Sequence, residues 1–193
     1  FDRANIQKDT VFCIADDAYQ LVNKEGAGLF FGPGITNAQN GIFNPAIAGV
    51  GTHLILFNLP GKCTDTVKIT VNGLPNVSVL GLKDYYCYKD SMTQLVLNPT
   101  GGLLQGSGLV GTIFNPSIAK QGQHTIKYTF GSGKCISTFS KDITVGEPLV
   151  LTLSKNKDSI CVGETVELST ISKGGNGNST LLWSSGQMNV PNI

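Results

Sequence analysis

The residues in this chain whose side chains could do the most chemistry are its five cysteines. Cys63 follows Cys13 by 50 residues, and Cys135 follows Cys87 by 48. These similar spacings predict the disulfides Cys13–Cys63 and Cys87–Cys135, and they leave Cys161 to a partner beyond the last residue. Such a framework indicates an oxidising compartment, whereas the alternative is a set of buried, reduced thiols. A metal site is disfavoured because no two cysteines lie within a few residues of each other.

The chain has two histidines, His53 and His124, and they occupy equivalent places in repeated sequence. Each begins a segment of alternating apolar and polar residues, so the two side chains belong to different modules and cannot easily meet. No serine or cysteine has a paired histidine that would activate it, and no metalloprotease or Walker pattern occurs. We therefore predict two structural, hydrogen-bonded histidines, and no catalytic, cofactor-binding or metal-ligating residues.

Two other motifs suggest ligands but fit turns better. Gly106-Ser107-Gly108-Leu109-Val110-Gly111 matches the dinucleotide fingerprint, which needs a preceding strand and a following helix. Asn115-Pro116 follows instead, which predicts further turns. Asp16-Asp17 could start a calcium site, but calcium needs several more oxygen ligands at loop spacing. We therefore expect turns at both places and no bound cofactor.

These residues recur because the sequence repeats itself with a period of 71 to 74 residues. The landmarks of the first copy are Cys13, Phe43-Asn44-Pro45, His53 and Cys63, and those of the second are Cys87, Phe114-Asn115-Pro116, His124 and Cys135. A period of this length, with a cysteine pair inside each unit, predicts tandem copies of one small, disulfide-stabilised domain. The expected domains are 1–72, 73–146 and an incomplete third repeat at 147–193.

The composition favours strands and excludes several classes of partner. Charged residues make up 14% of the chain and the net charge is +1, which excludes a strong electrostatic footprint for nucleic acid or an anionic membrane. No apolar stretch is long enough to span a bilayer, so direct membrane insertion is not expected. The chain contains 24 glycines and 40% hydrophobic residues, a profile typical of all-β domains with many turns. Because the first residue is Phe1, we interpret the chain as part of a longer protein.

Alternation of apolar and polar residues predicts the strands of each repeat. In 52–59, His53, Ile55, Phe57 and Leu59 are expected to face inward, and 124–130 repeats the pattern. The turns at 60–62 and 131–134 then lead into returning strands at 65–71 and 137–145. Further short strands are expected at 4–7, 10–15, 19–23, 76–82, 84–88, 93–97 and 149–153. Short strands at regular spacing predict immunoglobulin-like β-sandwich domains, arranged in a row through the brief proline-bearing joints 72–75 and 146–148.

The third unit opens like the others at Cys161, but it carries Trp183 22 residues later. A tryptophan packed on a disulfide is typical of immunoglobulin-like domains, so this segment is expected to be another such domain.

The first copy resembles the PKD/Ig-like repeats of very large surface proteins in gliding, Bacteroidota-type bacteria. The motifs that carry this resemblance are Cys13, Gly32-Pro33-Gly34, Gly41-Ile42-Phe43-Asn44-Pro45, Ala48-Gly49-Val50-Gly51-Thr52-His53 and Gly61-Lys62-Cys63. The second copy is looser, and the Trp183 segment resembles another subtype from the same proteins. The resemblance implies type IX secretion and a role in adhesion or gliding, as in SprB-like adhesins.

The function expected from the repeat and the resemblance is a non-catalytic, extracellular stalk or adhesive segment of a cell-surface adhesin. Its partners would be a surface polysaccharide or a solid substratum, together with export or motility machinery. The alternative is a carbohydrate-binding region attached to a secreted polysaccharide hydrolase. Sugar sites present exposed aromatic rings, and Phe30-Phe31 and Tyr85-Tyr86 are the candidates for that role.

A modification pattern accompanies the cysteines. Thr10, Thr66, Ser91 and Ser159 each follow an aspartate and precede an aliphatic residue. This arrangement resembles the O-glycosylation sequon of exported proteins of the same bacteria. The alternative is that Asp-Ser and Asp-Thr are ordinary residues at the start of strands.

Overall fold

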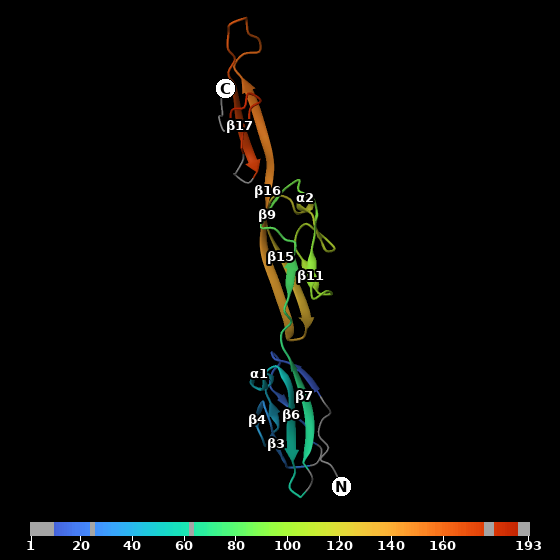
Figure 1. Cartoon of the computed structure of the whole chain (residues 1–193). Coiled ribbons are helices and arrows are strands. Elements are labelled where there is room, and N and C mark those ends of the chain that lie inside the picture. The colour runs from blue at the N-terminus through green and yellow to red at the C-terminus, as the bar shows by residue number, and fades with distance from the viewer. Residues whose placement is uncertain (1–9, 24–25, 62–63, 176–179, 189–193) are drawn as a thin grey trace. The chain divides into compact units, whose positions relative to one another are not determined.

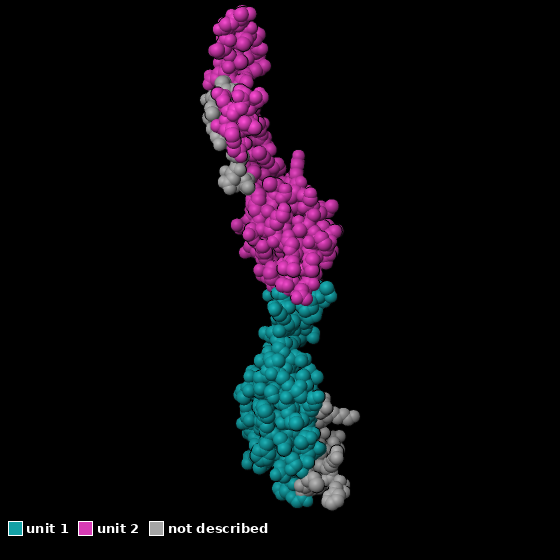
Figure 2. Space-filling view, viewed as in Figure 1, with its two compact units in different colours: residues 1–77, 99–102, 129–138 teal, residues 78–98, 103–128, 139–193 magenta. Residues whose placement is uncertain are grey.

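The computed structural model describes residues 10–23, 26–61, 64–175 and 180–188 of the chain (Figure 1). The contacts divide the chain into two compact units (Figure 2). Unit 1 comprises residues 1–77, 99–102 and 129–138, and unit 2 comprises the remainder. The regular secondary structure of both units is almost entirely β-strand, which confirms the predicted all-β class with immunoglobulin-like β-sandwich domains in tandem. The expected domain ranges 1–72, 73–146 and 147–193 stay predictions.

Unit 1 is built from two sheets with a core of apolar side chains. The larger sheet has the order β1 (Thr10–Cys13), β7 (Asp65–Asn72), β6 (Gly51–Asn58) and β3 (Leu29–Phe31). The smaller sheet has the order β2 (Tyr19–Gln20), β5 (Ile42–Phe43) and β4 (Ile35–Asn37). β1 runs parallel to β7, whereas the other pairs are antiparallel. The core is formed mainly by Phe12, Leu21, Phe30, Phe43, Ile55, Phe57, Leu59, Val67, Ile69 and Val71.

Unit 2 repeats this arrangement with different strand lengths. Its main sheet contains β12 (Leu103–Gln105), β15 (Gly122–Ser132), β16 (Cys135–Lys155) and β17 (Leu168–Gly175), and β9 (Tyr85–Cys87) pairs with β16. The pairing of β9 with β16 is parallel, like that of β1 with β7. Smaller sheets join β10 (Thr93–Gln94), β14 (Ile113–Phe114) and β13 (Leu109–Val110), and pair β11 (Val96–Asn98) with β8 (Ser78–Leu80). The fully buried side chains are Tyr86, Phe114, Ile126, Tyr128, Ile143 and Val145.

The predicted alternation is confirmed in both repeats. In β6, Ile55 and Phe57 are buried while Leu54 and Leu56 are exposed. In β15, Ile126 and Tyr128 are buried, whereas Thr125 and Lys127 are exposed. A strand that has one face toward the core needs this period of two, which is why the sequence pattern was informative. Of the other expected strands, 4–7 lies outside the described residues.

Two short helices were not predicted from the sequence. Helix α1 spans Pro45–Ala48 and helix α2 spans Pro116–Ala119. Asn44 caps the first, because its side-chain Oδ1 accepts hydrogen bonds from the backbone N–H groups of Ala46 and Ile47. Asn115 caps the second by accepting from Ser117 N–H at 3.0 Å. The Asn-Pro pairs supplied the signal, since asparagine is favoured at the N-cap and proline at the first helical position.

Strand β16 differs most from expectation. The proline-bearing joint predicted at 146–148 lies inside this 21-residue strand. It is a neighbour of β15 in the sheet, its residues 144–146 pair with β9, and from Glu147 onward it pairs with β17, with a register shift between Glu147 and Val150. Pro148 lacks a backbone N–H, so the pairing is interrupted there by an irregularity rather than ended by a loop.

Candidate functional site

The described cysteines form one disulfide, between Cys13 at the end of β1 and Cys135 at the start of β16. The two Cα atoms lie 5.4 Å apart, and the bond joins residues separated by 122 positions in sequence. The predicted pairs Cys13–Cys63 and Cys87–Cys135 are therefore wrong. The physical reason is that the long β15–β16 hairpin has its turn, residues 129–138, packed within unit 1. Cys63 itself lies outside the described residues.

The remaining described cysteines are Cys87 and Cys161, and both are free and exposed. Because the partner predicted for Cys161 lies beyond the last residue, the packing of Trp183 on a disulfide of the third unit stays a prediction. The Trp183 backbone closes a turn, in which Trp183 N–H donates to the Gln187 carbonyl at 3.0 Å.

The two aspartates after Cys13 stabilise the disulfide region. Asp16 Oδ2 accepts a hydrogen bond from Cys13 N–H at 2.7 Å, and Asp16 N–H donates to the Cys13 carbonyl at 3.0 Å. Asp17 forms an ion pair of 2.5 Å with Lys134 in the hairpin turn. Because both partners are more than half exposed, this pair contributes at most about 1 kcal/mol. Within the described ranges, no three His, Cys, Asp or Glu side chains gather as metal ligands would.

Both histidines make the predicted structural hydrogen bonds. His53 Nε2 lies 2.9 Å from the Gly49 carbonyl oxygen, and His124 Nε2 lies 2.9 Å from the Lys120 carbonyl oxygen. A carbonyl can only accept, so Nε2 carries the hydrogen in each ring. The two rings therefore anchor the chain that leaves each short helix.

The glycine-rich motif of the second repeat lies in a turn, as predicted. Residues 106–108 connect β12 to β13, which is followed by β14 rather than by a helix. Gly108 has a φ of 81°, and a Cβ there would lie 2.5 Å from the Ala119 side chain. The glycine is required by the backbone conformation and by the close approach of α2.

The aromatic pairs proposed for sugar binding are mostly internal. Phe30 is 1% exposed and stacks at 4.7 Å on Phe57, and Tyr86 is fully buried at 4.8 Å from Phe114. Phe31 is exposed, whereas the Tyr85 hydroxyl is buried. Neither pair forms the exposed aromatic platform that the carbohydrate-binding hypothesis needs.

Sequence reasoning missed an exposed apolar surface on the larger sheet of unit 1. We call it the outer face, and it comprises Leu29, Phe31, Leu54 and Leu56. The last three side chains are 47%, 60% and 41% exposed. Phe31 pairs directly with Leu56, so these residues adjoin across β3 and β6. The sequence did contain the signal, because the outward phase of 52–59 includes Leu54 and Leu56.

The corresponding face of unit 2 is more polar, although Leu103 replaces Leu29 there and is 59% exposed. Counting from the aligned histidines, Thr125 and Lys127 replace Leu54 and Leu56, and both are exposed. Counting from the aligned glycines at 32 and 106, Gln105 replaces Phe31. Three of the four apolar positions of the outer face are thus polar in unit 2, so the shared framework does not require them to be apolar.

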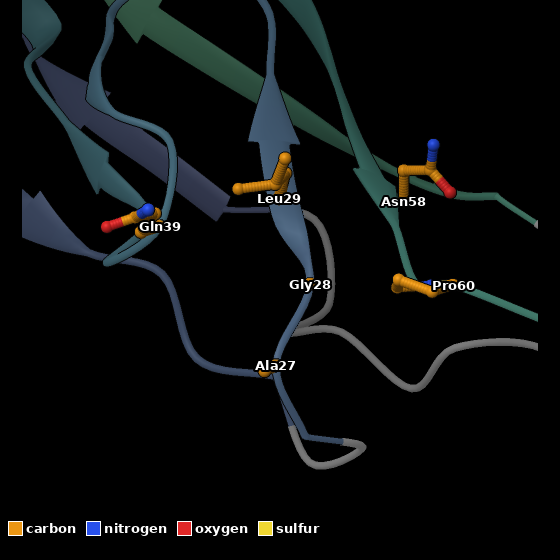
Figure 3. Close-up of a pocket in the computed structure, with 6 residues that line it drawn as sticks. All are labelled: Ala27, Gly28, Leu29, Gln39, Asn58 and Pro60. Carbon is orange, nitrogen blue, oxygen red and sulfur yellow. The ribbon is translucent and has the colours of Figure 1, made fainter.

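A pocket of about 570 Å³ opens beside the outer face (Figure 3). Its described lining consists of Ala27, Gly28, Leu29, Gln39, Asn58 and Pro60. These side chains include two amides but no titratable group and no aromatic ring. The described lining of the pocket thus offers hydrogen-bonding amide groups.

The hydroxyl groups of the modification pattern lie on strands and turns. Thr66, Ser91 and Ser159 are exposed, and Thr10 is half-buried in β1. Two of the preceding aspartates accept backbone hydrogen bonds: Asp65 from Thr66 N–H at 2.8 Å, and Asp90 from Cys87 N–H at 3.0 Å. These bonds give Asp65 and Asp90 a structural role that is independent of glycosylation.

No helix within the described part of the chain is both long enough and apolar enough to cross a bilayer. No protein-family profile matches the chain, and no curated protein matches it. Among solved structures, it is similar to the protocadherin GammaB4 extracellular domain, with 12% identity and a TM-score of 0.37 over 81% of this chain and 33% of that one. It is also similar to insect hemolin, with 13% identity and a TM-score of 0.35 over 73% and 46%. The titin fragment I67–I69 aligns over 88% of this chain and 75% of its own length, at 9% identity and a TM-score of 0.36. The chain thus spans less than half of the first two structures.

Proposed function

We propose that this chain is a non-catalytic, extracellular repeat segment of a cell-surface adhesin. The observation that carries the proposal is the apolar outer face of unit 1, in which the second repeat has polar residues at three of the four positions. An exposed apolar patch that the framework does not need is a feature of interaction sites. The Cys13–Cys135 disulfide supports an oxidising, extracytoplasmic location.

A solid apolar substratum is the partner that fits this face. The outer face lies on β-strands that extend side by side, and its side chains are aliphatic apart from Phe31. Lys68 pairs with Leu54, and Thr66 with Leu56, so polar residues border the patch. Such a surface can exclude water from an apolar wall, whereas polysaccharide recognition needs several aromatic rings and directed hydrogen bonds.

Adsorption to surfaces of defined chemistry tests this proposal. The double variant Leu54→Thr/Leu56→Lys introduces the residues that the second repeat carries. We expect its retention on a methyl-terminated surface to fall about tenfold, because two aliphatic contacts are lost. A quartz crystal microbalance measures the retained mass, with a hydroxyl-terminated surface as the reference.

The matched control is Leu80→Thr/Val96→Lys. These two residues pair across β8 and β11 in unit 2, and they are 61% and 56% exposed. The control variant should adsorb like the original chain. Equal losses in both variants would contradict a specific outer face, and preferential retention on insoluble polysaccharide would favour the carbohydrate-binding alternative.

The finer assignment is a type IX-secreted, SprB-like adhesin that acts in adhesion or gliding motility, in association with export or motility machinery. It is supported by the sequence motifs around Phe43-Asn44-Pro45 and Gly61-Lys62-Cys63. Surface labelling of source cells with and without a functional type IX system tests it. Undiminished surface exposure in the secretion-deficient cells would contradict this assignment.

O-glycosylation at Thr66, Ser91 or Ser159 is part of the same proposal, and their exposed positions support access by a transferase. Thr10 is the less accessible candidate. Intact-mass spectrometry of native material should show hexose-type increments, and an unmodified mass would exclude the modification.

A further inference from the structure

Three segments of the chain fold into the same turn around a cysteine. Cys13 N–H donates to Asp16 Oδ2, Cys87 N–H donates to Asp90 Oδ2 at 3.0 Å, and Cys161 N–H donates to Glu164 Oε2 at 3.3 Å. In each turn the acidic residue also donates its own backbone N–H to the carbonyl of the cysteine. The hydrogen-bonded turn around Cys13 is thus repeated around Cys87 and Cys161.

Cys13 and Cys87 also occupy equivalent places in their sheets. Cys13 ends β1 and lies opposite Asn72, the last residue of the parallel strand β7. Cys87 ends β9 and lies opposite Gly146 of the parallel strand β16. Each cysteine is thus positioned where its repeat passes into the next one.

In unit 1 this place is occupied by the β15–β16 turn. Cys135 bonds to Cys13, its Sγ lies 3.6 Å from the Gly73 carbonyl oxygen, and Lys134 forms an ion pair with Asp17. The turn comes from the sequence of the second repeat, so the disulfide joins one repeat to the turn of the repeat that follows. Gly131 is needed within the turn itself, because a Cβ there would lie within 3.0 Å of three backbone atoms of Cys135 and Ile136.

In unit 2 the corresponding place is a hollow of about 270 Å³. It is lined by Cys87, Tyr88, Lys89, Glu147, Pro148, Leu149 and Gly175. The Cys87 thiol is exposed and free at its margin. The hollow thus corresponds to the place that receives Cys135 in unit 1. In both places a cysteine lies in the same kind of turn, at the end of a strand that pairs in parallel with a longer one.

We propose that Cys87 is a cross-linking site that forms a disulfide with a cysteine in the β-hairpin turn of a following repeat. The occupant is a Gly-Lys-Cys turn of the kind that this chain carries at 133–135. Bond formation proceeds by thiol–disulfide exchange: the Cys87 thiolate attacks a small-molecule disulfide and releases one thiol. The thiolate of the incoming cysteine then displaces the second thiol. Successive repeats would thus be linked covalently, whatever surface the protein contacts.

The first test inserts a second copy of residues 73–146 directly after Gly146 in the full chain. In the inserted copy, Cys87→Ser removes the duplicated cysteine, so that only the original Cys87 remains. Ile136→Val in the same copy changes the mass of its turn peptide, which distinguishes it from the original turn peptide. After oxidation in a glutathione buffer, unreduced tryptic digestion separates peptides 84–89 and 135–141. We expect Cys87 linked to the marked turn, alongside an unchanged Cys13–Cys135 link in the same molecule.

The matched control carries Cys135→Ser in the inserted copy, and there Cys87 should react completely with iodoacetamide. The proposal is overturned if Cys87 remains free while Cys13–Cys135 forms, or if Cys87 bonds to Cys63 or Cys161. A Cys13–Cys63 link would also overturn it, because pairing would then lie within repeats.

A second measurement uses the unaltered chain, so that the result does not depend on the folding of the insertion. A synthetic peptide of residues 122–143 carries its cysteine as a mixed disulfide with thionitrobenzoate. We expect it to react about tenfold faster with Cys87 than with Cys161, while the same activated disulfide of glutathione shows no such preference. Equal rates with the peptide would contradict a shaped site at Cys87.

Discussion

The Tyr85 hydroxyl is buried in unit 2 and has no hydrogen-bond partner among the described residues. Burial raises the pKa of Tyr85 above its ordinary value of 10.0, and the nearby Cys87 and Asp90 raise it further. The neighbouring Tyr86 differs, because its hydroxyl accepts from Lys83 N–H at 3.0 Å and donates to the Gly81 carbonyl at 3.4 Å. Of these two adjacent tyrosines, Tyr86 thus has a hydrogen-bonded hydroxyl and Tyr85 has an unsatisfied one.

Substitution by phenylalanine should separate these two tyrosines. Tyr85→Phe removes an unsatisfied hydroxyl, so the free energy of unfolding at neutral pH should stay constant or rise. Tyr86→Phe removes a bonded hydroxyl and should lower it by about 1 kcal/mol. Denaturant unfolding at pH 7 measures both variants, and a larger loss for Tyr85→Phe would contradict the contrast.

The pH dependence of stability should follow from the same group. The native state retains the Tyr85 proton at a pH where the unfolded chain has released it, so the native state binds more protons. The stability of the original chain should therefore fall as pH rises through 10. Tyr85→Phe should show a shallower decline between pH 9 and pH 11, and an identical decline would exclude this contribution.

At the level of single residues, the sequence identified the histidines correctly and the aromatic pairs incorrectly. The repeat placed His53 and His124 at equivalent positions, and each forms the bond that such a position allows. Phe30 and Tyr86 looked like surface rings because composition cannot reveal which of two adjacent aromatics faces the core. In β3 and β9 the strand phase decides this, and strands of three residues are too short to show a phase.

Among the elements, the short helices depend on their asparagine caps. Asn44→Ala should lower the free energy of unfolding by about 1 kcal/mol, because two backbone N–H groups lose their acceptor. Asn98→Ala, an exposed residue of β11 that caps no helix, serves as the control. Chemical denaturation provides the comparison, and equal effects would show that the cap is unimportant.

The hairpin β15–β16 depends on its disulfide for attachment within unit 1. Cys135→Ser should destabilise the chain by up to about 5 kcal/mol, since the bond closes a loop of more than one hundred residues. Cys161→Ser should have no effect, because that thiol is free. Thermal unfolding with and without reductant checks both, and the Cys135→Ser variant should be insensitive to reductant.

The elements were easier to predict than their connections. Alternation fixed the phases of β6, β7 and β15, because a sheet with one buried face imposes it. The disulfide partner of Cys13 could not be derived, since several connectivities fit five cysteines equally well. The similar spacings of 50 and 48 residues favoured pairing within repeats, but they carry no information on where a long hairpin places its turn.

For the whole molecule, the disulfide determines how much chain can extend under tension. Force applied to the two termini passes from Cys13 directly to Cys135, so the residues between them are shielded. Reduction should release about 400 Å of additional contour length at full extension. Single-molecule pulling with and without reductant measures this increment, and its absence would contradict mechanical protection by the disulfide.

The same bond has a consequence for survival among extracellular proteases. Exposed loops are the preferred places of proteolytic cleavage, and most loops of both units lie between Cys13 and Cys135. A single cut at any of them opens a ring rather than dividing the molecule, so both fragments remain one covalent species. On an electrophoresis gel, the cleaved protein would separate into two fragments only after the disulfide is reduced. A cut that would divide a chain of domains without such a bond would therefore leave the two parts of this protein joined.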